Sequence, residues 1–132
     1  MLRKDFILAQ IEELGKLIAQ IVNRRKSGKT HQITPLIENA YSSLNIDGNY
    51  LLDNTPEEIF IYLNTNGNSG LQRMEMAAKI LVEESFLFPG QKARIRAKAR
   101  EILEYVTAHD TTFSMERESL LQELREEDNP SQ

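Results

Sequence analysis

The fold is decided first by residues 7–22, which read ILAQIEELGKLIAQIV. Their apolar side chains recur at alternating steps of four and three residues, the spacing of one face of an α-helix. This face consists of Ile7, Ile11, Leu14, Ile18 and Ile21. The pattern predicts a long helix over about 2–25, ended by a cluster of cations and by Gly28. Gly15 interrupts the helix and costs about 1 kcal/mol of helix propensity, so we expect a packing reason for it.

Two threonine–proline pairs indicate helix starts further along the chain. Thr34-Pro35 reads as an N-cap followed by proline in the first turn. Thr55-Pro56 has the same form and is completed by Glu58, which makes a capping box. Between these two starts, residues 45–49 (NIDGN) are rich in turn formers, so we expect a break between helices there.

The second half of the chain predicts a helical hairpin over about 71–108. Apolar residues fall on two faces of the segment 71–87, which is typical of a central helix with neighbours on both sides. Phe88-Pro89-Gly90 then turns the chain into a second helix. Small alanines on both segments allow the two helices to approach closely, which gives the hairpin a tetratricopeptide-like shape. A last helix is expected to begin after Ser114.

No segment shows the alternation of a strand. The sequence therefore predicts an all-α fold, with residues 1–132 forming one domain of about six helices packed as antiparallel hairpins. Residues 64–70 (NTNGNSG) should form the most mobile loop, and an acidic tail over about 127–132 should fray.

Several segments resemble an uncharacterised family of small all-helical bacterial proteins. They are residues 5–14, the stretch from Asn45 to Ile59, and residues 101–106 followed by 113–117. The shared positions are helix caps and core residues. That family has no assigned activity, so the resemblance implies a helical fold and a bacterial source but no site residues.

The composition excludes several classes of chemistry. The chain has no Cys, which excludes disulfides, cysteine-ligated zinc and a thiol nucleophile, and which is typical of a reducing cytoplasm. The first residues lead into a charged amphipathic pattern rather than a signal peptide. No run approaches the roughly 18 apolar residues of a membrane span. We therefore expect a soluble cytoplasmic protein that does not contact the membrane.

Residues that could support catalysis are isolated from one another. Gly28-Lys29-Thr30 ends like a P-loop, but the first glycine of that motif is replaced by Asn23. His31 and His109 have no His or carboxylate partner three or four residues away. Adjacent carboxylates diverge by about 100° on a helix, so we interpret these pairs as solvated or capping charges. The pairs are Glu12-Glu13, Glu57-Glu58, Glu83-Glu84 and Glu126-Glu127. We therefore predict no enzyme and no catalytic, cofactor-binding or metal-binding residues.

The strongest candidate for a binding surface is a basic run over 92–100. It holds five bases in nine residues without an acid, and Lys92, Arg96 and Arg100 form one stripe on a helix. The stripe is explained either as the solvated side of a core-facing helix or as a site for an acidic protein. Nucleic acid is the weaker alternative, because no aromatic residue interleaves the charges and the net charge is −4.

These observations favour a non-catalytic protein–protein interaction module, with Lys92, Arg96 and Arg100 steering an acidic partner. The alternative is a structural or regulatory homo-oligomer. In that case the apolar face of the first helix, from Ile7 to Ile21, would pair two chains as a homodimer.

Overall fold

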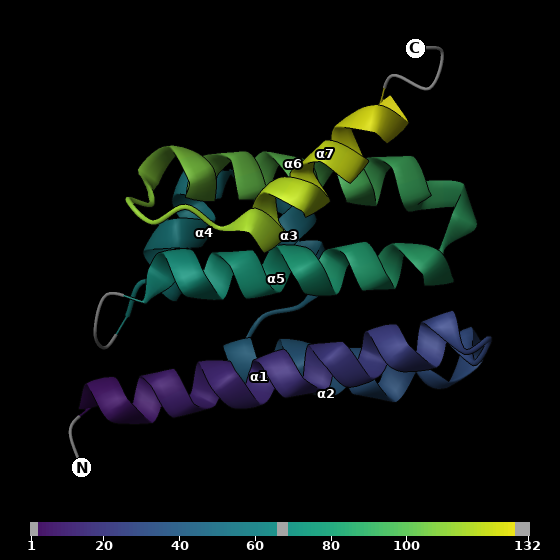
Figure 1. Ribbon diagram of the computed structural model, residues 1–132, viewed down its shortest axis with the longest axis horizontal. Coiled ribbons are helices and arrows are strands. Elements are labelled where there is room, and N and C mark those ends of the chain that lie inside the picture. Colours follow the sequence, from purple (N-terminus) through teal and green to yellow (C-terminus); the bar gives the residue numbers. More distant parts are fainter. Residues whose placement is uncertain (1–2, 66–68, 129–132) are drawn as a thin grey trace.

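The structure, a computed structural model, describes residues 3–65 and 69–128 (Figure 1). Within these ranges the chain forms seven α-helices and no strand, which confirms the all-α prediction. The helices are α1 (Arg3–Lys26), α2 (Thr34–Leu44), α3 (Gly48–Asp53), α4 (Pro56–Leu63), α5 (Gly70–Glu84), α6 (Lys92–His109) and α7 (Met115–Asp128). No helix in this part of the chain has both the length and the apolar character needed to cross a membrane.

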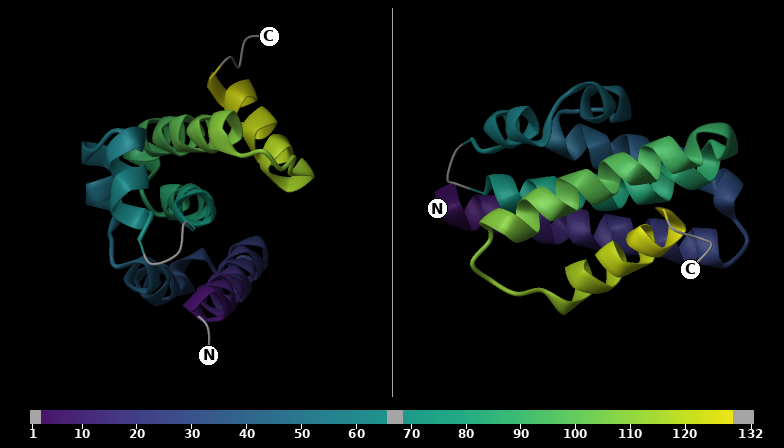
Figure 2. Two further views of the ribbon diagram at one scale, coloured as in Figure 1. Left: turned by 90° about the vertical axis from the view of Figure 1, so that its left-hand side faces the viewer. Right: turned by 90° about the horizontal axis from the view of Figure 1, so that it is seen from above.

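Helix α5 lies at the centre of the fold. It contacts α1, α2, α4 and α6, and the end-on view in Figure 2 shows the other helices arranged around it. Met74 and Leu81 of one apolar face are buried, and on the other face Ile80 is buried and Met76 is partly buried. The prediction of a central helix with neighbours on both sides is therefore confirmed.

Helices α5 and α6 form the predicted antiparallel hairpin (Figure 1). The connection consists of two short 3-10 turns, Ser85–Leu87 and Pro89–Gln91. Ala77, Ala78 and Ala99 are fully buried, and small side chains of this kind let two helices pack closely. Helices α1 and α2 form a second antiparallel pair, which packs against α5.

The sequence missed one helix and misplaced one N-cap. The break predicted over 45–49 leads directly into the short helix α3, where the Asp47 side chain accepts a hydrogen bond from the Tyr50 amide at 2.8 Å. Six residues are too few to show a helical period, so the pattern missed this helix. Thr34 begins α2, but it makes no capping hydrogen bond, and Ile33 occupies the N-cap position.

The capping box at Thr55 is confirmed. The Thr55 hydroxyl accepts from the Glu58 amide at 3.1 Å, and the Glu58 carboxylate accepts from the Thr55 amide at 2.8 Å.

Thr55→Ala should lower the free energy of unfolding by about 1 kcal/mol, because it leaves an amide of the first turn without its partner. Urea unfolding followed by circular dichroism measures this loss. Thr34→Ala is the matched control and should change stability by less than about 0.5 kcal/mol. Equal losses in the two variants would contradict the capping role.

The last helix also begins as predicted, because Ser114 Oγ accepts a hydrogen bond from the Arg117 amide at 3.1 Å. Leu121 and Leu124 of α7 are buried in the core. The acidic tail was predicted to fray over about 127–132, but helix α7 extends to Asp128, so residues 127 and 128 are helical and residues 129–132 lie outside the described residues. The same holds for residues 66–68 of the loop predicted to be mobile.

Candidate functional site

The predicted basic stripe is largely directed into the fold. The guanidinium of Arg96 lies 5.5 Å from the centre of the Phe86 ring, and Arg96 Nη1 donates to Ser85 Oγ at 3.4 Å. Lys92 Nζ lies 4.6 Å from the same ring. Arg96 is only 4% exposed, and Arg100 is half-buried. A cation held over an aromatic face of its own chain is not presented to an outside partner. The stripe is therefore not a continuous outer surface in this conformation.

The apolar face of α1 is used within the chain. Ile7, Leu14, Ile18 and Ile21 are all buried, and Ile11 is half-buried. This face packs against α2 and α5, so a second chain could pair with it only if those contacts opened. The residues proposed for self-association therefore do not form an uncovered apolar face in this structure.

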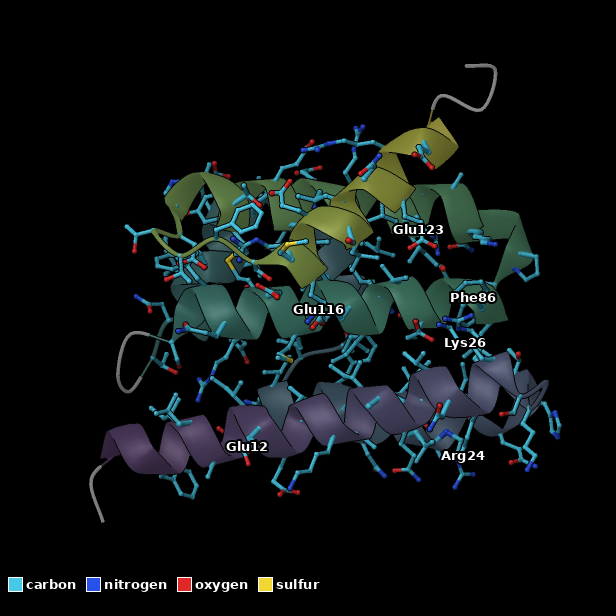
Figure 3. The ribbon with its side chains drawn as sticks, in the orientation of Figure 1. Glu12, Arg24, Lys26, Phe86, Glu116 and Glu123 are labelled. Carbon is cyan, nitrogen blue, oxygen red and sulfur yellow. The ribbon has the colours of Figure 1, made fainter. Side chains whose placement is uncertain are left out.

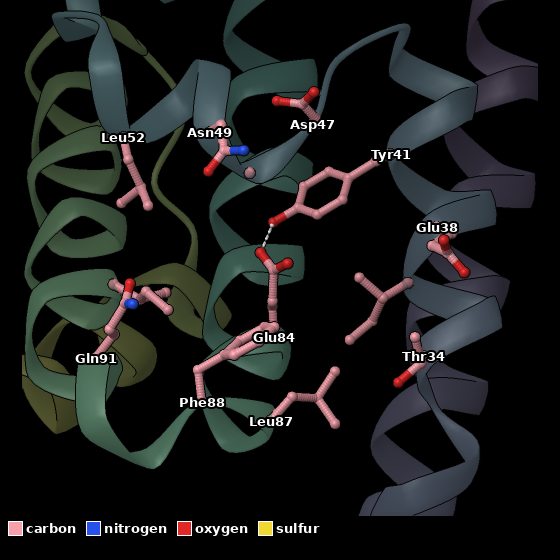
Figure 4. Close-up of a pocket in the computed structure, with 13 residues that line it drawn as sticks. Thr34, Glu38, Tyr41, Asp47, Asn49, Leu52, Glu84, Leu87, Phe88 and Gln91 are labelled. Atoms are coloured by element: carbon pink, nitrogen blue, oxygen red, sulfur yellow. Dashed lines mark hydrogen bonds between the residues drawn. The ribbon is translucent and has the colours of Figure 1, made fainter.

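A pocket of about 620 Å³ lies where α2 and α3 meet the α5–α6 connection (Figure 4). Apolar side chains form part of its wall, and polar side chains enter from several elements. The apolar residues are Ile37, Leu52, Leu87, Phe88 and Ile95; the polar ones are Thr34, Glu38, Tyr41, Asp47, Asn49, Glu84 and Gln91. We name it the Glu84 pocket, after the carboxylate at its centre.

Glu84 is held by one hydrogen bond and one close approach. Tyr41 Oη donates to Glu84 Oε1 at 2.6 Å, as the dashed line in Figure 4 shows. A Cβ atom at Gly48 would lie only 2.6 Å from the same oxygen, so a side chain at that position would force the carboxylate to move. Glycine at the first residue of α3 therefore lets the backbone close over Glu84.

Among the described residues, no cation compensates the charge of the Glu84 carboxylate. It makes no ion pair with any described residue, whereas its neighbour Glu83 binds Arg25. Burial raises the pKa of Glu84, the nearby charge of Asp47 raises it further, and the Tyr41 hydrogen bond lowers it in part. Burial and the charge of Glu84 raise the pKa of the Tyr41 phenol, so it stays protonated and remains a donor. A cation entering the pocket would relieve the unfavourable charge on Glu84.

All charged side chains that line the pocket are acidic. Glu38, Asp47 and Glu84 line it, and none of its lining residues is Lys or Arg. Apolar walls beside these acids suit a group with an aliphatic stem and a cationic head. The described residues contain no group of three or more His, Cys, Asp or Glu placed to hold a metal ion.

No sequence pattern indicated this pocket. We interpreted Glu83-Glu84 as solvated or capping charges, and that was wrong. Glu83 is 5% exposed and binds Arg25 through two bonds, Nε–Oε1 at 2.6 Å and Nη2–Oε2 at 3.2 Å. Glu84 is the next residue of α5, and it contacts Tyr41, which is 43 positions away in the chain. No local pattern reports so distant a contact.

No protein-family model, curated protein or solved structure matches this chain. The resemblance to a small bacterial family therefore receives no support beyond the all-helical fold itself. The same applies to the tetratricopeptide-like interpretation of the hairpin.

Proposed function

We propose that this protein is a non-catalytic interaction module that binds a basic segment of a partner protein in the Glu84 pocket. The observation that carries the proposal is the half-buried Glu84 carboxylate, which has a tyrosine donor but no cation among the described residues. A Lys or Arg side chain would lay its aliphatic stem along Leu87 and Phe88 and direct its charged end at Glu84.

This proposal reverses the charge of the partner expected from the sequence. The basic stripe suggested an acidic partner, but its central residue Arg96 is buried, whereas the Glu84 pocket is acidic and open to solvent. We retain a tetratricopeptide-like mode of action, in which a helical surface binds an extended partner segment, and we place it in the bacterial cytoplasm. Both remain part of the proposal.

An array of short peptides tests this function. It carries Lys or Arg between apolar residues, together with matched peptides in which Gln replaces the base. The wild-type protein should bind the basic peptides, and Glu84→Gln should raise their Kd at least about tenfold, because a charge-assisted hydrogen bond is lost. The glutamine in this variant keeps an oxygen that can accept from Tyr41, so the fold should be retained.

Glu57→Gln is the matched control, because Glu57 is exposed on α4 and is not a lining residue of the pocket. It should bind the basic peptides as the wild type does. Equal binding of basic and Gln peptides, or an unchanged Kd in Glu84→Gln, would contradict the proposed site.

The pH dependence of binding gives a second readout of the same experiment. Only the ionised carboxylate attracts a cation, and the pKa of Glu84 is raised above the ordinary value of 4.5. Affinity of the wild type should therefore fall as the pH drops through a range above 4.5, and Glu84→Gln should lack this component. Parallel pH profiles for the two proteins would show that Glu84 does not hold the ligand.

A further inference from the structure

A second hollow lies on a different face, between α1 and α7, with α5 as its floor. Figure 1 faces this side of the molecule, and the end-on view in Figure 2 shows α1 and α7 flanking α5. Two adjoining hollows of about 520 and 440 Å³ share Ile18, Val22, Lys79 and Glu116 in their linings. They therefore form one continuous groove, which we call the α1–α7 groove.

The groove presents one incompletely covered apolar side chain from each of its three helices. Val22 of α1, Met76 of α5 and Leu120 of α7 are each packed against the core but only partly buried. Ile18 and Val82 lie deeper and are buried. Three helices that each direct an apolar side chain into a common groove offer apolar contacts to a docked fourth helix.

At one end of the groove, α1 contributes no side chain to the wall. Gly15 lines the groove, and a Cβ added there would meet no atom within 4 Å. The packing reason expected for this helix-interior glycine is thus not found among the described residues. Ala19 lines the same wall one turn further on and is exposed. Small residues one turn apart let a docked helix approach the α1 backbone closely.

The two edges of the groove differ in charge. Glu116 and Glu123 lie seven residues apart along the α7 edge, and both are exposed (Figure 3). Glu116 also pairs with Lys79, which binds Glu75 as well. On the α1 edge the one base in the lining is Lys26, at the far end of the groove. The long α7 edge is therefore acidic and would attract a basic flank.

We propose that the α1–α7 groove binds one amphipathic helix of a partner protein. Its apolar stripe would contact Val22, Met76 and Leu120, and its basic flank would face Glu116 and Glu123. The groove extends along α1 from Gly15 to Lys26, which is about 16 Å at ~1.5 Å per residue and corresponds to roughly three helical turns.

The charges favour such a partner over a second copy of this chain. A symmetric pair whose two-fold axis runs across the groove would bring two acidic α7 edges together, and like charges at an interface oppose association. The groove has no lining residue in common with the Glu84 pocket, so the two proposals can be tested separately.

The test uses a helical probe peptide of about 12 residues with leucines at i, i+4 and i+7 and lysines along one flank. A mirror probe carries glutamates in place of the lysines. Fluorescence anisotropy should detect binding of the lysine probe and little binding of the glutamate probe. Amide NMR signals of Val22, Lys79 and Leu120 should shift on titration.

Gly15→Leu is the decisive variant. It adds a side chain at the end of the wall that lacks one, where a Cβ meets no atom within 4 Å, and it removes a glycine from a helix interior. It should therefore raise the Kd of the lysine probe at least about tenfold while the unfolding midpoint stays equal or rises. Gly90→Leu adds the same side chain in open space outside the groove and should bind normally. Glu123→Gln should weaken binding, and Glu57→Gln should not.

Three results would overturn the proposal. The first is normal probe binding by Gly15→Leu. The second is a set of signal shifts centred on Glu84 rather than on the groove, which would instead support the Glu84 pocket. The third is a dimeric mass of the free protein that Gly15→Leu abolishes, because it would make a second copy the occupant. The first and third results do not bear on binding of basic peptides in the Glu84 pocket.

Discussion

Arg117→Ala is expected to lower the free energy of unfolding by about 3 kcal/mol. Arg117 is 3% exposed and joins three parts of the fold. Its Nη1 lies 3.0 Å from Glu75 Oε1 on α5 and 3.1 Å from Asp110 Oδ2 after α6, and its Nε donates to Thr107 Oγ1 at 3.1 Å. Truncation removes all of these contacts and leaves the partly buried carboxylates of Glu75 and Asp110 with fewer partners.

The size of the effect follows from what remains after truncation. Removing one partner of a buried ion pair costs about 3–5 kcal/mol when the other charge is left alone. Glu75 retains Lys79 Nζ at 3.4 Å, so the lower end of this range applies. The pKa of Asp110 is lowered, first by the Thr112 amide and then by Arg117. At pH values above the pKa that Asp110 has in the unfolded chain, its carboxylate therefore stabilises the fold. This contribution is lost as the pH falls through the lower pKa that Asp110 has in the folded chain.

Urea unfolding at neutral pH measures the loss. Arg125→Ala is the control, because the pair that Arg125 forms with Glu104 at 3.4 Å is exposed and worth less than about 1 kcal/mol. Similar losses in the two variants would show that Arg117 does not hold α7 against α5 and α6.

Arg96→Glu is the second substitution with a large expected effect, a loss of about 3–5 kcal/mol. It replaces a buried cation that lies over Phe86 with a carboxylate, which the negative face of an aromatic ring does not favour. Arg25 also lies over this ring, with its guanidinium carbon 4.0 Å from the centre, so the ring is surrounded by cations from α1 and α6. The variant should unfold at a clearly lower urea concentration.

Arg94→Glu makes the same charge change two residues away at an exposed position and should alter stability by less than about 0.5 kcal/mol. The comparison separates two interpretations of the basic run. If Arg96→Glu is as stable as Arg94→Glu, Arg96 is not needed by the fold, and the stripe could again serve an outside partner. If Arg96→Glu is destabilised as expected, any loss of partner binding in this variant reflects unfolding.

Much of the helical framework could be predicted because its signals are local. The Thr55–Glu58 box and the Ser114 cap involve residues three positions apart, so the sequence places both partners directly. The periods of α1 and α5 correctly indicated which faces are buried. Helix α3 was missed because six residues, Gly48–Asp53, carry too little of a period, and its cap at Asp47 resembles an ordinary turn.

The candidate sites could not be predicted, because a periodic pattern states that a face is buried but not what covers it. Lys92 and Arg96 lie over the Phe86 ring, whereas the sequence alone predicts that they form an exposed stripe. Gly15 is visible in the sequence as an anomaly, yet only the structure shows that it borders an open groove.

The sequence by itself determined the helices, most of their starts and the faces they bury, because hydrogen bonds and side-chain spacing within a helix act over three or four residues. Only the tertiary structure decided which charges lose their solvent and which partners they acquire. Arg25 meets Glu83 across 58 positions, Tyr41 meets Glu84 across 43, and Arg117 meets Glu75 across 42. The physical reason is that burial and pairing depend on how whole helices pack, and this packing brings together residues that no local spacing relates.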